Sequence, residues 1–169
     1  VSLTLNRGDR IALVGRNGCG KSSLLKLLIG QPIAHTGTLE IGSRLTVSYV
    51  PQDMSFLSGS ADNFAAESEI DITLFKTILR KLDFKRTQFT KDMSEFSMGQ
   101  KKKVLLARSL CQRANLYIWD EPLNYIDVIS RLQIETLILE YKPTMLFVEH
   151  DEAFVNDIAT KVCRISLNQ

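Results

Sequence analysis

The sequence contains few cysteines, and their spacing argues against two classes of protein. Among 169 residues there are three cysteines, Cys19, Cys111 and Cys163, and they form no Cys-x-x-Cys pair. A disulfide framework uses an even number of cysteines, and a structural zinc site uses closely spaced pairs. We therefore expect neither.

Long apolar runs and strong net charge are also lacking. No segment approaches the roughly 18 uninterrupted apolar residues of a membrane span, and no signal peptide precedes the first expected strand. The net charge is only +2, so composition gives no argument for or against a polyanionic partner. Internal repeats and low-complexity tracts are absent. These features predict a cytoplasmic protein without a transmembrane segment.

The length suits a single α/β core and is too short for two comfortable domains. A hydrophobic fraction of 44% and a charged fraction of 24% are ordinary for a soluble globular protein. Both ends look cut: residues 1–5 already alternate like a strand without a Met start, and residues 162–167 read as a strand with no closing helix. We expect one domain, 1–169, truncated from a longer protein.

The chain is organised around residues 11–28, where a buried strand leads into Gly15-Arg16-Asn17-Gly18-Cys19-Gly20-Lys21-Ser22 and then an apolar helix. This order fits the phosphate-binding P-loop, G-x-x-x-x-G-K-[ST]. Glycines let successive N–H groups point inward, and the helix N-terminus favours an anion. Lys21 would reach the β- and γ-phosphates, and Ser22 would bind Mg²⁺. A Gly-rich turn that binds nothing is the alternative, and the complete strand-loop-helix order disfavours it.

The remaining pattern predicts the fold class. Leu3 and Leu5 alternate as in a half-buried strand, and 37–42 with 45–50 read as two strands joined by a turn. An apolar stripe at helical spacing follows between Leu74 and Leu82. We expect an α/β P-loop protein with a mostly parallel sheet, an antiparallel β layer on the N-terminal side, and a small helical lobe inserted at 62–112.

Two further segments carry polar residues at structurally informative points. Ser97 is a good N-cap, and Gln100 three residues on completes a capping box, so the helix that follows offers free N–H groups beside Gly99. The lysines at 101–103 are expected to form a solvated face or to support this loop. Asp127 is expected to cap a helix over 128–141.

The carboxyl ends of two expected strands carry the remaining candidates. Residues 116–119 lead into Asp120-Glu121, and 144–148 lead into Glu149-His150. Ligands bind at this edge of an open parallel sheet. Each residue alone is an ordinary loop residue, but beside a P-loop they are expected to converge on one nucleotide.

These motifs, together with Gln52 after a strand, FSMGQ at 96–100 and LYIWDE at 116–121, resemble the nucleotide-binding domain of an ATP-binding-cassette (ABC) ATPase over nearly the whole chain. The resemblance implies ATP and Mg²⁺ as cofactors, with Glu121 and His150 catalytic, and with Ser22, Gln52 and Asp120 around the metal. It implies that Ser97 and Gly99 serve ATP on a second ABC domain packed head to tail, so that an isolated domain hydrolyses ATP weakly. The implied nucleotide-binding residues are Gly15, Arg16, Asn17, Gly18, Cys19, Gly20, Lys21, Ser22, Ser23, Gln52, Ser97, Gly99 and Gln100.

The segment EPLNYID at 121–127 is similar to the ABC-F pattern, and GQKKK after Met98 is similar to its antibiotic-resistance branch, whose members act on the ribosome. The resemblance thus implies a cytoplasmic, ribosome-acting ATPase of which this is the C-terminal ABC domain. The alternatives are the motor subunit of a membrane transporter, with a permease partner, and a clamp that binds ATP without hydrolysing it. Glu121 disfavours the clamp.

Overall fold

Five short strands form one parallel sheet in the computed structural model, which describes residues 2–166. The strand order is β2-β3-β4-β1-β5, and each neighbouring pair is parallel. The strands are β1 (Arg10–Val14), β2 (Val47–Val50), β3 (Leu116–Asp120), β4 (Met145–Val148) and β5 (Lys161–Arg164). The helices are α1 (Lys21–Leu28), α2 (Ala61–Glu67), α3 (Ile72–Lys81), α4 (Met98–Cys111), α5 (Val128–Tyr141) and α6 (Glu152–Ile158).

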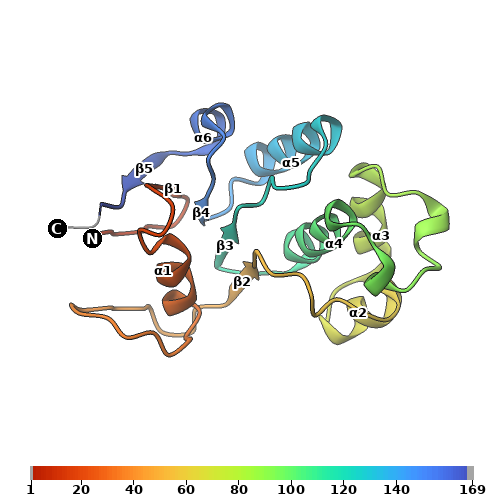
Figure 1. The fold of residues 1–169 in the computed structure, drawn as a ribbon, viewed down its shortest axis with the longest axis horizontal. Helices are drawn as coiled ribbons and strands as arrows, with labels where there is room; N and C mark the ends of the chain where they lie inside the picture. Colours follow the sequence, from red (N-terminus) through yellow and green to blue (C-terminus); the bar gives the residue numbers. More distant parts are fainter. Residues whose placement is uncertain (1, 167–169) are drawn as a thin grey trace.

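The central strands divide their apolar side chains between two cores because neighbouring residues of a strand point to opposite faces. In β4, Leu146 and Val148 face one core, which α1 covers with Leu25. Met145 and Phe147 face the other core, to which α4, α5 and α6 contribute. Figure 1 shows α1 on the opposite side of the sheet from α5 and α6. The middle strands are thus covered on both faces, as a parallel sheet requires.

The segment between β2 and β3 forms a helical lobe of α2, α3, α4 and two single turns, Arg86–Gln88 (η1) and Met93–Glu95 (η2). Figure 1 shows α2, α3 and α4 gathered beyond β2 at one end of the molecule. Phe75, Ile78, Leu79 and Leu82 are buried there, which confirms most of the predicted apolar stripe as core packing. Leu74, its first member, is exposed, so the prediction is wrong for that residue. The same core continues through α4 to Trp119 of the sheet, so the lobe and the sheet share one hydrophobic cluster.

Local capping signals place several helix starts as predicted. Ser97 accepts a hydrogen bond from the Gln100 amide, and Gln100 Oε1 accepts one from the Ser97 amide, which completes the capping box of α4. Asp127 caps α5 through the Ser130 amide, and α5 covers the predicted residues 128–141. These caps rest on interactions within four residues, which explains why the sequence predicts them.

The predicted parallel α/β sheet is confirmed, but the predicted antiparallel layer is wrong for the described residues. Residues 2–9 and 31–46 contain no strand, and the second strand of the expected hairpin shrinks to β2, which pairs parallel with β3. Leu39, Ile41 and Leu45 are exposed, so the hairpin has little apolar surface to bury. A lone two-stranded ribbon is marginal in water. Val1 and Leu167, at the ends of two expected strands, lie outside the described residues.

Candidate functional site

The loop between β1 and α1 has the backbone geometry of an anion nest. Gly18 and Gly20 adopt positive φ angles of 78° and 94°, which lets the chain turn tightly into the helix. Gly15 is fixed by crowding, because a Cβ there would lie 2.5 Å from the Ile165 carbonyl oxygen and 2.8 Å from Cys19 Sγ. Cys19 is buried, as expected for a small filler side chain.

Lys21 lies across this loop. Its ammonium donates hydrogen bonds to the carbonyl oxygens of Gly15 (2.9 Å) and Arg16 (3.0 Å), and the residue is buried. The ammonium charge therefore lies in the hollow of the loop and is bound by two carbonyl oxygens. When a phosphate binds, its oxygen would replace these carbonyl oxygens as the partner of Lys21. Arg16, Asn17, Gly18 and Ser23 are exposed around it, and Ser22 lies half-buried at the start of α1.

The strand register brings the other candidates to the same edge of the sheet. Asp120 pairs with Val148 at the ends of β3 and β4, so Glu121 and His150 leave the sheet side by side. His150 Nε2 lies 3.5 Å from Glu121 Oε1. In the sheet β4 lies between β3 and β1, so His150 follows the strand beside the one that leads into the P-loop, and Glu121 follows the next strand beyond it. Gln52 lies just beyond β2, at the end of the sheet that is farther from the P-loop, and its side chain is exposed.

Asp120 has the environment of a cation ligand. It is 1% exposed, and its Oδ1 atom has no hydrogen-bond partner among the described residues. Burial raises the pKa of Asp120, while a hydrogen bond from Ser22 and the charge of Lys102 act in the opposite direction. An unpartnered buried carboxylate oxygen beside a serine hydroxyl fits Mg²⁺, which prefers oxygen ligands.

Glu121 is held in an uncommon backbone conformation. Its φ angle is 49°, in the left-handed region, and that of Tyr125 is 66°. The Glu121 amide donates to the Val148 carbonyl oxygen (2.9 Å), and Asn124 Nδ2 donates to Glu121 Oε2 (2.5 Å). Such strain concentrates at functional sites. Asn124 is not among the candidates from the sequence. Its contact with Glu121 depends on the shape of the turn, which helical or strand periodicity does not predict.

The N-terminus of α4 lies against the loop that follows Glu121 and not against the P-loop. A Cβ at Gly99 would stand 2.6 Å from the Tyr125 carbonyl oxygen, so only glycine allows this approach. Ser97 is exposed, and its hydroxyl and the Gln100 side chain are engaged in capping. Close backbone packing thus joins Gly99 to the loop that follows Glu121. None of the hydrogen bonds within residues 2–166 joins Ser97, Gly99 or Gln100 to Lys21 or Ser22.

The expectation that residues 101–103 form a solvated face is wrong for two of the three lysines. Lys102 is 1% exposed, and its Nζ donates to the Pro51 carbonyl oxygen (3.3 Å). Burial lowers the pKa of Lys102, against the attraction of Asp120, Glu121 and Glu149. The alternative expectation, support of a loop, describes them better.

Lys103 is the second buried member of the run. Its Nζ lies 2.6 Å from Asp127 Oδ2, which ties α4 to the start of α5. Lys101 is only partly exposed, and no ion pair is formed by it within residues 2–166.

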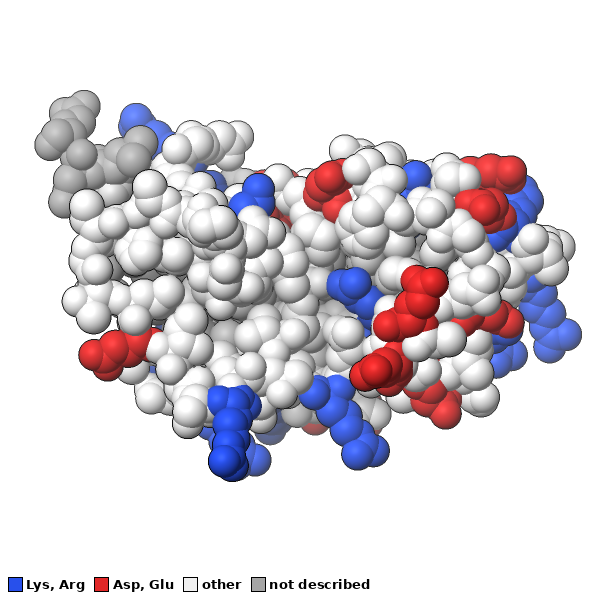
Figure 2. Space-filling model, turned by 90° about the horizontal axis from the view of Figure 1, so that it is seen from below, with Lys and Arg blue, Asp and Glu red and all other residues white. Residues whose placement is uncertain are grey.

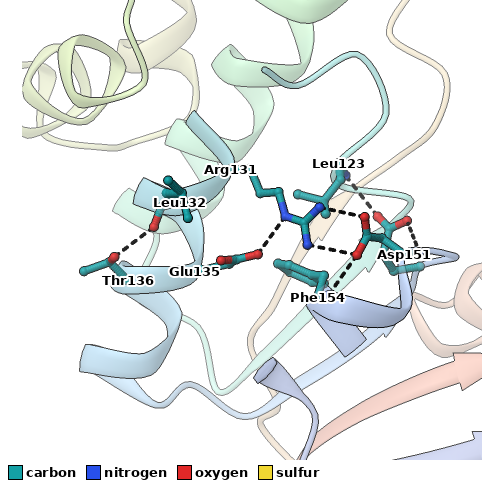
Figure 3. Close-up of polar contacts among 8 residues, drawn as sticks. Leu123, Arg131, Leu132, Glu135, Thr136, Asp151 and Phe154 are labelled. Atoms are coloured by element: carbon teal, nitrogen blue, oxygen red, sulfur yellow. Dashed lines mark hydrogen bonds and ion pairs between the residues drawn. The ribbon is translucent and has the colours of Figure 1, made fainter. Parts of the chain in front are cut away.

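A polar cluster joins α5 to the segment after β4, and no pattern in the sequence predicts it. Arg131 of α5 forms a bidentate pair with Asp151 (2.6 and 2.9 Å) and contacts Glu135 (2.8 Å), and Figure 3 shows the guanidinium pointing at both carboxylates. The hydrogen bonds from Arg131 lower the pKa of Asp151. Because the arginine and Asp151 are 20 residues apart, no local pattern could indicate the pair.

On the one face drawn in Figure 2, charge of neither sign forms a continuous patch. On the face drawn in Figure 2, Lys and Arg side chains lie among Asp and Glu side chains, many of them toward one end of the molecule. This agrees with the small net charge. Among residues 2–166 no helix is both long enough and apolar enough to cross a membrane.

With the loop, the carboxylates and the histidine at one sheet edge, the geometry defines a P-loop nucleotide-binding fold. The family model described as "ABC transporter" matches residues 1–124, well over half of the chain, and the chain belongs to this family.

Three relatives are similar along nearly the whole chain. It is 38% identical over 173 residues to the ATP-binding protein YdiF of Bacillus subtilis (strain 168), covering 98% of this chain and 26% of YdiF. It is 36% identical over 163 residues to the ATP-binding protein Uup of Escherichia coli (strain K12), with coverages of 92% and 26%. ABC transporter F family member 2 of Arabidopsis thaliana is 30% identical over 170 residues, with coverages of 97% and 25%. The chain thus spans about a quarter of the length of these relatives.

Solved structures with a similar fold include further ABC proteins. The archaeal ribosome recycling factor aABCE1, in complex with the archaeal ribosomal stalk protein aP1, matches with a TM-score of 0.77 and 27% identity, over 95% of this chain and 32% of that chain. An ATP-binding subunit of an ABC transporter matches with a TM-score of 0.84 and 21% identity, over 98% and 78% of the two chains, which supports the fold alone.

Proposed function

We propose that this chain is an ATP-hydrolysing domain of an ABC-F protein, one of two ABC domains packed head to tail on a longer, cytoplasmic polypeptide that acts on the ribosome. The observation that carries the hydrolytic part is the 3.5 Å approach of His150 to Glu121 beside the P-loop. Relatives named as ABC-F and Uup proteins, and a structural neighbour named as a ribosome recycling factor, support the rest.

The residues present support a division of labour around ATP and Mg²⁺. Lys21 and the amides of 15–22 would bind the phosphates, and Ser22, Asp120 and Gln52 would hold Mg²⁺, which neutralises developing phosphate charge. Glu121 would orient and deprotonate the attacking water, and His150 would hold the γ-phosphate and that water in line. Ser97 and Gly99 would serve the nucleotide of the second ABC domain, as the resemblance to ABC ATPases implies. Gly99 packs against Tyr125, which holds the start of α4 in place for that role.

The antibiotic-resistance branch is the finer form of this proposal. Its support is the resemblance of the segment EPLNYID and of the lysine run after Gln100 to that branch. No residue of this chain identifies a drug, so the proposal concerns ribosome binding first.

A transporter motor is the second candidate, and one surface feature favours it. A groove of about 590 Å³ lies beside Gln52, lined by Tyr49, Pro51, Asp53, Phe56 and Arg108 among others. Phe56 is 53% exposed in it. A helix of a permease could lie in this groove, with the exposed Phe56 ring as its apolar contact.

Glu121→Gln in the full-length protein separates these candidates. We expect it to abolish ATP hydrolysis, trap ATP, and cause ATP-dependent co-sedimentation with purified ribosomes. Recovery in the membrane fraction, without ribosomes, would favour the transporter motor. If Glu121→Gln hydrolyses ATP at the wild-type rate, the catalytic role of Glu121 is refuted for both candidate functions.

A further inference from the structure

Glu149 is a buried carboxylate to which the proposed chemistry gives no task. It follows the last residue of β4 and is 5% exposed. Within residues 2–166 it forms no ion pair with a Lys, Arg or His side chain. A charge buried to this degree is costly unless its oxygens are satisfied in another way.

Backbone amides satisfy it. Glu149 Oε1 accepts hydrogen bonds from the amides of His150 (2.7 Å) and Asp151 (3.3 Å), and Oε2 accepts one from the amide of Leu123 (3.1 Å). Carboxylate bonds to N–H groups are charge-assisted and stronger than neutral ones. The first two are local, but the third crosses 26 residues to the loop that carries Glu121.

The carboxylate therefore joins the two loops that hold the catalytic candidates. Leu123 lies two residues after Glu121, with Pro122 between them, and His150 is the next residue after Glu149. Helix capping does not account for the arrangement, because α6 is already capped by Asp151 through the Phe154 amide. Arg131 fixes Asp151 from the other side, so the His150 loop is held at both ends, and Figure 3 shows Leu123, Arg131 and Asp151 within this one cluster.

We propose that Glu149 is a positioning residue that sets the separation of Glu121 and His150 by bridging their loops, an inference that rests on the ATPase function proposed above. It touches neither nucleotide nor water in this role. Losing the bridge lets the loop at 121–125 shift relative to His150, and a displacement of about 1 Å between catalytic groups costs on the order of 100-fold in rate.

The test compares Glu149→Ala and Glu149→Gln in the full-length protein. Glu152→Ala is the matched control, because Glu152 is an exposed carboxylate three residues further along. Glutamine has the same shape but keeps only one acceptor oxygen, so it retains part of the bridge. For every variant, the turnover rate is the measured rate of ATP hydrolysis minus the rate that remains in Glu121→Gln.

We expect Glu149→Ala to lower kcat by about 10- to 100-fold with KM within about twofold of wild type, and Glu149→Gln to lower kcat by about three- to tenfold. Without nucleotide, amide hydrogen exchange of segments 121–127 and 149–153 should accelerate at least about fivefold in Glu149→Ala and less in Glu149→Gln. Glu152→Ala should match wild type in both measurements.

Unchanged exchange over 121–127, or a raised KM with wild-type kcat, would overturn the inference. If Glu149→Ala fails to fold, the isosteric Glu149→Gln decides by the same two criteria. Failure of the proposed function has a different signature: Glu121→Gln would then hydrolyse ATP like wild type, whatever the exchange data show.

Discussion

The ion pair between Lys103 and Asp127 should contribute measurably to folding, because it joins α4 to the start of α5. Lys103 Nζ lies 2.6 Å from Asp127 Oδ2, and their side chains are 11% and 46% exposed. Burial raises the pKa of Asp127, but hydrogen bonds from Lys103 and Ser130 outweigh it and lower the pKa to about 2 from a usual 3.8. After a discount for solvent screening of this half-exposed carboxylate, the pairing is worth about 1 kcal/mol.

Lys103→Met tests this value because methionine keeps the apolar stem and removes the charge. We expect the free energy of unfolding in urea to fall by about 1 kcal/mol at pH 7. Asp127→Asn should cost about 2 kcal/mol, because asparagine still caps α5 but leaves a mostly buried ammonium unpaired. In the double variant the two losses should not add, which gives a coupling of about 1 kcal/mol.

The pH dependence has a definite sign. The pKa of Asp127 is lower in the folded than in the unfolded state, so its contribution is complete above about pH 5 and is lost as the pH falls toward 2. The gap between wild type and Lys103→Met should therefore shrink by about half at pH 3. Lys101→Met is the control. Equal urea midpoints for Lys101→Met and Lys103→Met at pH 7, or a gap unchanged at pH 3, would refute this reasoning.

Two further substitutions test packing. Gly99→Ala places a Cβ 2.6 Å from the Tyr125 carbonyl oxygen, so it should cost about 1–3 kcal/mol in urea and at least about tenfold in Glu121-dependent hydrolysis, whereas Gly42→Ala, with open space around it, should change neither. Leu79→Ala removes a fully buried side chain of the helical lobe and should lower the free energy of unfolding by about 2–5 kcal/mol, against about 0.5 kcal/mol or less for the exposed Leu74→Ala. Gly99→Ala with wild-type hydrolysis, or equal urea midpoints for the two leucine variants, would contradict the packing described here.

Features governed by neighbouring residues could be predicted from the sequence. The P-loop turn, the capping box at Ser97 and the Asp127 cap each depend on a few adjacent residues, and all three appear as expected. The meeting of Glu121 and His150 follows from a parallel sheet, whose strand ends share one edge. Their roles in catalysis remain predictions.

Features that need a distant partner could not be predicted. The alternation around Leu3 and Leu5 is real, because both side chains pack against the core on the α1 side, yet no strand forms there. Alternation reports which face is apolar, whereas a strand also needs a hydrogen-bonding neighbour. The same limit applies to Glu149, whose amide partner Leu123 is 26 residues away.

The lysines after the capping box show why a charge run alone is ambiguous. Once Ser97 fixes where α4 begins, residues 102–107 are all buried, so this stretch of the helix has no solvent face for Lys102 to occupy. Asp120, Glu121 and Glu149 attract its ammonium, and the Pro51 carbonyl oxygen holds it one residue before Gln52. Three carboxylates at one sheet edge repel one another unless a cation stands among them. Lys102 therefore supplies part of the positive charge that this edge of the sheet requires, and it does so from the interior. A charge run read from the sequence alone would place this lysine in solvent.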